Sequence, residues 1–180
     1  ASKYDKATLT ASQVCVLTLD CGENLTPQLS PSIEAGMHLE IYRTRPEVNA
    51  IVHAHPVTAT AFCATRTPVN CRFTAEAYAI LGDPAWAPYA RMGTPELAKH
   101  VAAAAASSCC ILMQNHGVLT TGKNLLEAVD RLDVLESAAQ TTLIVSHLQD
   151  SREIPQTELA ELDALVGRPV HTGSRNQKKG

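Results

Sequence analysis

The chain has 180 residues, of which 45% are hydrophobic and 18% are charged, and its formal net charge is −3. This length suits one substantial domain, and the composition is that of a folded globular protein rather than a disordered one. The acidic balance argues against nucleic acid as a main partner, no apolar run is long enough for a membrane span, and the first residues lack the apolar segment of a signal peptide. We expect a cytoplasmic protein with a single domain over residues 1–165 and a mobile C-terminal tail over residues 166–180.

Strand and helix patterns alternate in the first third of the chain. Residues 10–20 alternate in polarity and predict a first strand. Residues 34–43 predict a helix, which follows the cap candidates Ser30 and Ser32. Residues 48–52 predict a second strand, because they are β-branched or apolar apart from one asparagine.

The same alternation continues through the rest of the chain. The patterns predict, in order, a helix over 57–64, a mixed segment with a short strand and a helical turn over 69–81, a loop or edge segment over 82–89, a helix over 95–106, strands over 110–114 and 118–120, and a long helix over 124–148. Some connections are too short for full crossovers, so we expect an α/β fold with a mixed or antiparallel sheet.

A His-x-His pair, His53 and His55, ends the second predicted strand. Side chains two apart on a strand point to the same face, with Cα atoms roughly 6–7 Å apart. Two such imidazoles can lean together onto one tetrahedral zinc ion. Pairs of this kind also occur by chance, and either ring could instead cap the turn at Pro56.

His116 adds a third imidazole, because it follows the apolar run 110–113 within Gln114-Asn115-His116-Gly117. Gly117 would let the backbone turn or approach closely at this point. Two strand ends that carry imidazoles could face one pocket. Three histidines with an open position describe a catalytic zinc site better than a closed structural one.

Other polar residues have simpler explanations. His38 lies one helical turn after Glu34, so a Glu-x-x-x-His metal pair is conceivable, but we prefer a structural role because the other three histidines already complete a ligand set. A solvated or interface face of the long helix is the simplest reading of Glu127, Asp130 and Glu136. The six cysteines form no C-x-x-C pair and are expected to be buried thiols rather than a disulfide frame.

The histidine segments belong to a longer series of short motifs. These are Pro31-Ser32-Ile33-Glu34, Met37-His38, Arg45-Pro46-x-x-x-Ala50-Ile51-Val52-His53-Ala54-His55-Pro56, Ala87-Pro88-Tyr89, Gly93-Thr94-x-Glu96-Leu97, Asn115-His116-Gly117 and Val134-Leu135-Glu136. In combination they resemble the class II aldolase/adducin family over about residues 9–148. The resemblance implies a three-layer α/β/α sandwich around a mainly antiparallel sheet, and a homotetramer with active sites between adjacent subunits.

The resemblance also implies a site. A divalent metal, usually zinc (Zn2+), would be held by His53, His55 and His116. Glu34 would coordinate the metal before substrate binds and then act as the acid/base, and Ser32 would contact the substrate. The implied reaction is the retro-aldol cleavage of a small sugar-like or sugar-phosphate-like hydroxy ketone, in which a divalent cation stabilises the enediolate.

Two departures from the family pattern bear on the substrate. Family members carry a Gly-Asn-x-Ser motif that helps grip the substrate phosphate, and this sequence contains no match. Ile33 stands where the family aldolase has a second serine, which favours a non-phosphorylated substrate. In addition, no tyrosine follows Tyr89, so a tail tyrosine that acts across the subunit boundary cannot be carried over.

Three functions therefore stay open. The first is a metal-dependent lyase, and the second uses the same metal site for epimerisation, dehydration or decarboxylation. The third is a non-catalytic, adducin-like scaffold, and the intact histidine trio with Glu34 argues against it.

Overall fold

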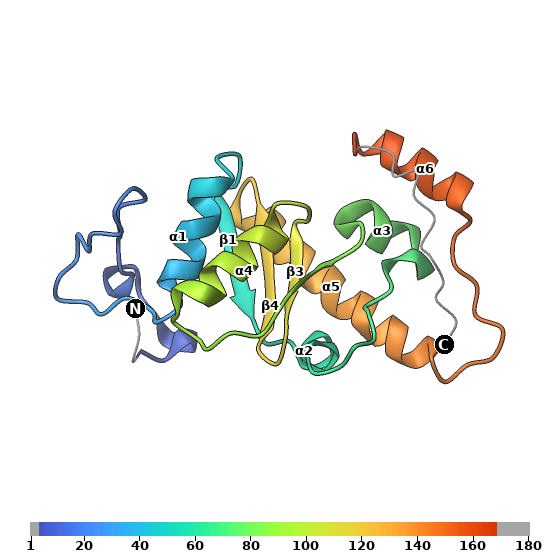
Figure 1. The fold of residues 1–180 in the computed structure, drawn as a ribbon, viewed down its shortest axis with the longest axis horizontal. Coiled ribbons are helices and arrows are strands. Elements are labelled where there is room, and N and C mark those ends of the chain that lie inside the picture. The colour runs from blue at the N-terminus through green and yellow to red at the C-terminus, as the bar shows by residue number, and fades with distance from the viewer. Residues whose placement is uncertain (1–3, 169–180) are drawn as a thin grey trace.

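Four strands form one sheet in the computed structural model, which describes residues 4–168 (Figure 1). In spatial order they are β1 (Ala50–Ala54), β4 (Gly117–Gly122), β3 (Cys110–Met113) and β2 (Ala85–Ala87). Both β1 and β3 run antiparallel to β4, whereas β2 is parallel to β3. The sheet is therefore mixed and mainly antiparallel, as the sequence predicted.

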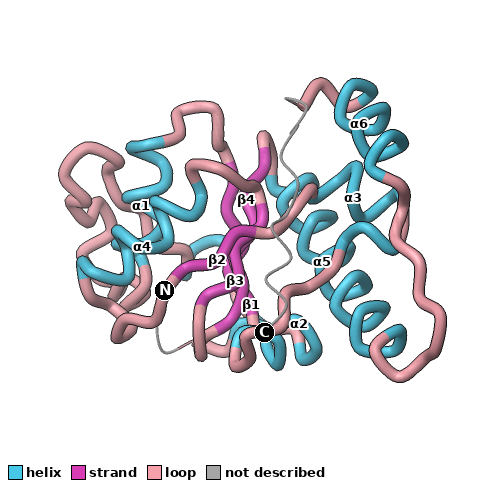
Figure 2. The backbone as a smooth tube through the Cα atoms, turned by 45° about the vertical axis from the view of Figure 1, so that its right-hand side comes forward, coloured by secondary structure: helices cyan, strands magenta, loops and turns pink. Residues whose placement is uncertain are grey.

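Helices cover both faces of this sheet (Figures 1 and 2). One side carries α1 (Ala35–Thr44) and α4 (Pro95–Ala105), and the other carries α2 (Val57–Cys63), α3 (Ala75–Leu81) and α5 (Leu125–Val145). The last helix, α6 (Gln156–Leu165), packs beyond α3. Three short 3-10 helices cover Lys6–Thr8, Ala11–Gln13 and Cys71–Phe73.

Alternate residues of the central strands face two separate cores. Ile111 and Met113 pack with α1 and α4, while Leu112 and Cys110 pack with α2, α3 and α5. Side chains two apart on a strand share a face, so a strand buried on both sides reads as a continuous apolar run. The two cores confirm the predicted three-layer α/β/α sandwich.

The predicted strand over residues 10–20 is wrong. The chain forms a 3-10 helix over Ala11–Gln13, and Leu17 makes only an isolated bridge to Asn24. Thr10 and Gln13 close a reciprocal capping box around that helix, with a distance of 2.8 Å from the Thr10 backbone nitrogen to Gln13 Oε1. This local cap outweighs the alternating pattern, which has no neighbouring sheet to pack against.

Two further segments differ from expectation. The mixed segment over residues 69–81 has no strand, because Asn70 caps the 3-10 helix at Cys71–Phe73 and Thr74 caps α3. Helix α6 was not predicted, and the predicted tail after residue 165 lies outside the described residues except for its first three. No helix within residues 4–168 is long and apolar enough to cross a membrane.

A buried carboxylate fixes α6 to α3. Asp163 is 1% exposed, and its carboxylate accepts hydrogen bonds from the Tyr78 hydroxyl at 3.1 Å and from Arg168 Nη1 at 3.0 Å. Arg168 also donates to the backbone carbonyls of Tyr78 and Ala79. The charge of Asp163 is therefore paired and hydrogen-bonded, as a buried charge must be.

We expect Asp163→Ala to lower the free energy of unfolding by about 3 kcal/mol, because it leaves the Arg168 charge without its partner. Urea denaturation measures the change. Glu161→Gln, an exposed position on the same helix, is the control and should match wild type. Equal stability of the Asp163 variant and the control would contradict the assigned role.

Candidate metal centre

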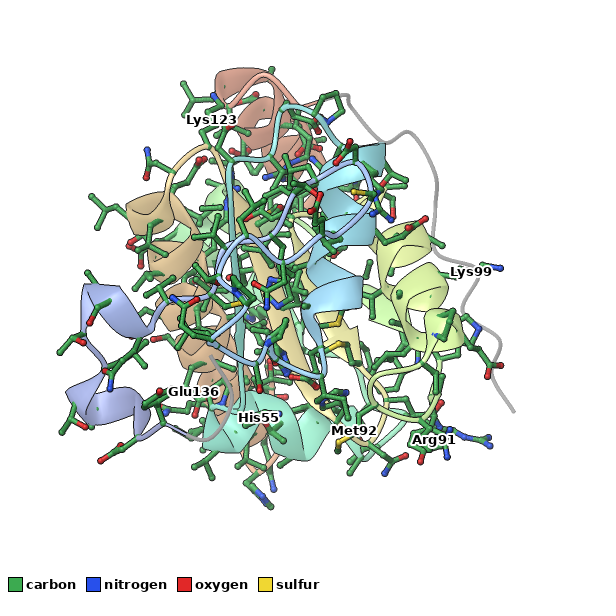
Figure 3. The ribbon with its side chains drawn as sticks, turned by 90° about the vertical axis from the view of Figure 1, so that its left-hand side faces the viewer. His55, Arg91, Met92, Lys99, Lys123 and Glu136 are labelled. Carbon is green, nitrogen blue, oxygen red and sulfur yellow. The ribbon has the colours of Figure 1, made fainter. Side chains whose placement is uncertain are left out.

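Three imidazoles meet at one end of the sheet. His53 lies on β1, His55 directly follows that strand, and His116 lies in the turn between β3 and β4. Their ring centroids are 4.7, 5.0 and 5.6 Å apart, and one nitrogen from each ring lies within 4.8 Å of the others. Figure 3 shows His55 at the end of the molecule opposite Lys123.

The turn between β3 and β4 is shaped to bring His116 to this cluster. Asn115 adopts a left-handed conformation (φ 51°), which asparagine tolerates better than most residues. At Gly117 a Cβ atom would lie 2.5 Å from His55 Cδ2 and 2.8 Å from the Ala54 carbonyl oxygen. Only glycine therefore allows the turn to approach the end of β1 so closely.

His53 is held in the form that binds a cation. Its Nδ1 lies 2.9 Å from the Val118 carbonyl oxygen, which can only accept, so Nδ1 carries the proton and Nε2 keeps a lone pair. Nε2 is buried and has no hydrogen-bond partner among the described residues, and Glu34 Oε2 lies 3.2 Å from it. Burial also lowers the pKa of His53, which favours the neutral ring. A buried, neutral nitrogen without a donor partner fits a divalent metal ligand.

Glu34 joins the three histidines from the start of α1. Its Oε1 lies 2.6 Å from His116 Nε2, and its Oε2 is the atom in contact with His53. Ser32 lies two residues earlier and is exposed, and its hydroxyl accepts a hydrogen bond of 3.3 Å from the Glu34 backbone nitrogen. The structure thus brings the four predicted metal residues together, with Ser32 beside them in the chain.

Two other candidate residues, His38 and Glu136, are not part of the histidine cluster. His38 is not part of the ligand group, and burial lowers its pKa to about 4, with a further contribution from the nearby His53. Glu136, which the sequence placed on a solvated or interface face, instead accepts hydrogen bonds from the start of α2, 77 and 78 residues away in the chain. No pattern within the sequence of α5 could have revealed that contact.

Residues 1–143 match the sequence family described as "Class II Aldolase and Adducin N-terminal domain". The chain belongs to the class II aldolase and adducin family. An L-fuculose phosphate aldolase from Methanococcus maripaludis is 36% identical over 141 residues, which cover 78% of this chain and 75% of that protein. A 3-oxo-tetronate 4-phosphate decarboxylase from Haemophilus influenzae is 34% identical over 149 residues, covering 81% and 70%.

Solved structures give the same assignment. An L-fuculose 1-phosphate aldolase superposes with a TM-score of 0.84 and 29% identity, covering 92% of this chain and 77% of that one. A sugar-phosphate aldolase from Thermotoga maritima has a TM-score of 0.66 and 25% identity, covering 78% and 66%. The prediction of an aldolase-like enzyme, a metal-dependent lyase of the retro-aldol type, is confirmed.

His38 should make the metal-free protein less stable in mild acid. Because its pKa is about 4 in the folded state and about 6.5 when unfolded, the unfolded chain binds a proton first as the pH falls. The free energy of unfolding carries no penalty from His38 above about pH 6.5. As the pH falls from about 6.5 to 4, this residue lowers the free energy of unfolding by on the order of 3 kcal/mol.

Urea denaturation of chelator-treated protein at pH 7 and pH 5 tests this expectation. His38→Gln, which cannot titrate, should show a smaller loss than wild type between the two pH values. A variant with the same pH dependence as wild type would show that the acid sensitivity comes from other groups.

Proposed function

We propose that His53, His55 and His116 hold one divalent cation, most simply zinc, and that Glu34 is the acid/base of a retro-aldol reaction. The observation that carries the metal assignment is the buried Nε2 of His53, which has a lone pair and no hydrogen-bond partner among the described residues. Three imidazole nitrogens and a nearby carboxylate also match the ligand types that zinc prefers.

The charge of the site separates what a bound cation would supply from what the residues of the chain do. When bound, a divalent cation polarises a carbonyl and offsets the negative charge that develops as a C–C bond breaks, which contributes several kcal/mol. Three neutral imidazoles leave that positive charge undiminished. The residues of the chain then have to orient the substrate, exclude water and move one proton.

Glu34 is placed to move that proton. Its carboxylate lies between two of the ligand rings, with a side chain only 16% exposed, and it can accept or donate a proton at either oxygen. We assign it the transfer of a proton to or from the carbon at which the bond breaks.

The substrate class is a small, sugar-like hydroxy ketone. The relatives named as L-fuculose phosphate aldolases support a phosphorylated one, and the hydroxyl of Ser32 beside Glu34 could contact it. Ile33 is 64% exposed and offers no hydroxyl that could donate a hydrogen bond to a phosphate. The homotetramer and the cytoplasmic location stay predictions.

Decarboxylation is the second candidate. It is favoured by the similarity to a 3-oxo-tetronate 4-phosphate decarboxylase, and loss of CO2 from a 3-oxo acid leaves an electron pair that the same cation can stabilise. Turnover assays with ketoses, their phosphates and 3-oxo acids distinguish the two reactions. Aldehyde release identifies retro-aldol cleavage, whereas CO2 release identifies decarboxylation.

The double variant His53→Ala/His55→Ala should lose its metal, because one imidazole and one carboxylate are too few ligands for a tetrahedral zinc site. Elemental analysis of the purified protein gives the zinc content, and circular dichroism checks the fold. The matched control is His100→Ala, an imidazole on α4 outside the ligand group. A folded double variant with full zinc content would overturn the ligand assignment.

Glu34→Gln should keep its zinc but lose turnover, since three histidines remain to hold the ion. The expected fall in kcat is about 10²–10⁴-fold, the usual contribution of a positioned proton donor or acceptor. Glu40→Gln, on the same helix, is the control. If the Glu34 variant kept zinc and more than about a tenth of the wild-type kcat, the acid/base role would be excluded.

A further inference from the structure

Helix α2 connects the two chain segments that carry the histidines. It begins at Val57, directly after His55-Pro56, and ends at Cys63. The Cys63 carbonyl oxygen accepts a hydrogen bond of 2.9 Å from the Asn115 backbone nitrogen, and its thiol donates to the Gly117 carbonyl at 3.2 Å. A displacement of α2 would therefore move His55 at one end and the His116 turn at the other.

The start of α2 cannot be capped by its own sequence. The first backbone N–H groups of a helix lack partners within the helix and need an acceptor. The N-cap position is Pro56, whose side chain has no acceptor, and no side-chain cap is present there. Glu136 supplies both acceptors from α5: its Oε1 lies 2.9 Å from the Thr58 nitrogen and its Oε2 lies 2.8 Å from the Ala59 nitrogen.

Glu136 is itself fixed and charged. Gln140, one turn later on α5, donates to its Oε1 at 3.2 Å. Burial alone would raise the pKa of Glu136, but the hydrogen bonds from Ala59 and Thr58 outweigh it, and the pKa lies below the usual value. An ionised carboxylate with both oxygens engaged is a strong cap.

His55 is the ligand that depends most on its backbone. The ring of His53 is oriented by the Val118 carbonyl, and that of His116 by the Glu34 carboxylate. The ring of His55 is exposed, and within residues 4–168 its nitrogens form no hydrogen bond. Its position therefore depends on the chain that leaves β1 and enters α2.

We propose that Glu136 is a positioning residue of the metal centre, which holds α2 so that His55 meets the other two ligands. This inference rests on the proposed function, because it assumes that the histidines bind a cation. The competing explanation is an ordinary helix cap, whose loss costs about 0.5–2 kcal/mol of stability and leaves the geometry of the site unchanged. The two explanations differ in what happens to metal affinity.

Zinc affinity, measured by competition with a chromophoric chelator, separates them. Glu136→Gln keeps the shape of the side chain, but its amide has one acceptor oxygen in place of two, so one of the two hydrogen bonds is lost. We expect it to lower zinc affinity by about 10-fold, the lower end of the effect of residues that support metal ligands. Thermal unfolding in excess chelator reports the loss of stability separately.

Glu127→Gln is the matched control. Glu127 lies on the same helix and also accepts from a backbone nitrogen, that of Lys123, and from Arg131. Figure 3 shows Lys123 at the opposite end of the molecule from His55 and Glu136. This variant should bind zinc as tightly as wild type, even where it unfolds at a lower temperature.

A local cap should rescue the site. In Glu136→Ala, the second substitution Pro56→Ser places a hydroxyl at the N-cap position, where serine is favoured. We expect the double variant to bind zinc more tightly than Glu136→Ala alone, with Pro56→Ser in the wild-type background as reference. Rescue would also show that Glu136→Ala loses zinc affinity because α2 is displaced, rather than because the whole protein is less well folded.

The outcomes are distinct. If wild type binds zinc and Glu136→Gln binds it equally well, the positioning role is overturned while the metal site stands. If Glu127→Gln weakens binding as much as Glu136→Gln, the effect comes from general destabilisation, and the positioning role again fails. If wild type binds no zinc or other divalent cation, the proposed function fails together with the inference that rests on it.

Discussion

The pairing of β1 with β4 is the constraint on which the candidate metal centre depends. In this register Ala54 lies opposite Val118, so the two strands are still adjacent where β1 ends before His55 and β4 begins at Gly117. A slip of one residue would turn every side chain of β1 to the other face of the sheet and remove His53 from the cluster. The close approach at Gly117, where a side chain has no room, fixes the same register from the other strand.

The position of this cluster at the end of the sheet solves an electrostatic problem. The central strands are buried on both faces by apolar layers, in which an unpaired polar group would be costly. Near this end of the sheet, the Val118 carbonyl oxygen on β4 orients the ring of His53. Glu34 arrives from the start of α1, so one face of the sandwich contributes the carboxylate and the strands contribute the imidazoles.

The sequence signals for the candidate site are local, which is why the residues they single out lie together in the structure. The His53-x-His55 spacing and the position of His116 after an apolar run depend only on strand geometry, and both are found in the structure. The strand expected over residues 10–20 failed because alternation indicates a strand only where a neighbouring strand exists. The cap that Glu136 provides was missed for a related reason, because the two groups that meet are far apart in the chain.

Helix α2 shows why such distant contacts matter for the site. An isolated helix of seven residues is unstable in water, since nucleation costs more than so few hydrogen bonds return. Pro56 presets the backbone angle at its start but supplies no acceptor, and the helix is held by α5 at one end and by the turn before His116 at the other. The chain that carries His55 into α2 is thus joined to α5 by the hydrogen bonds of Glu136. A carboxylate on α5 thus supplies the acceptors that the start of α2 lacks, although 77 and 78 residues of chain separate the groups that meet.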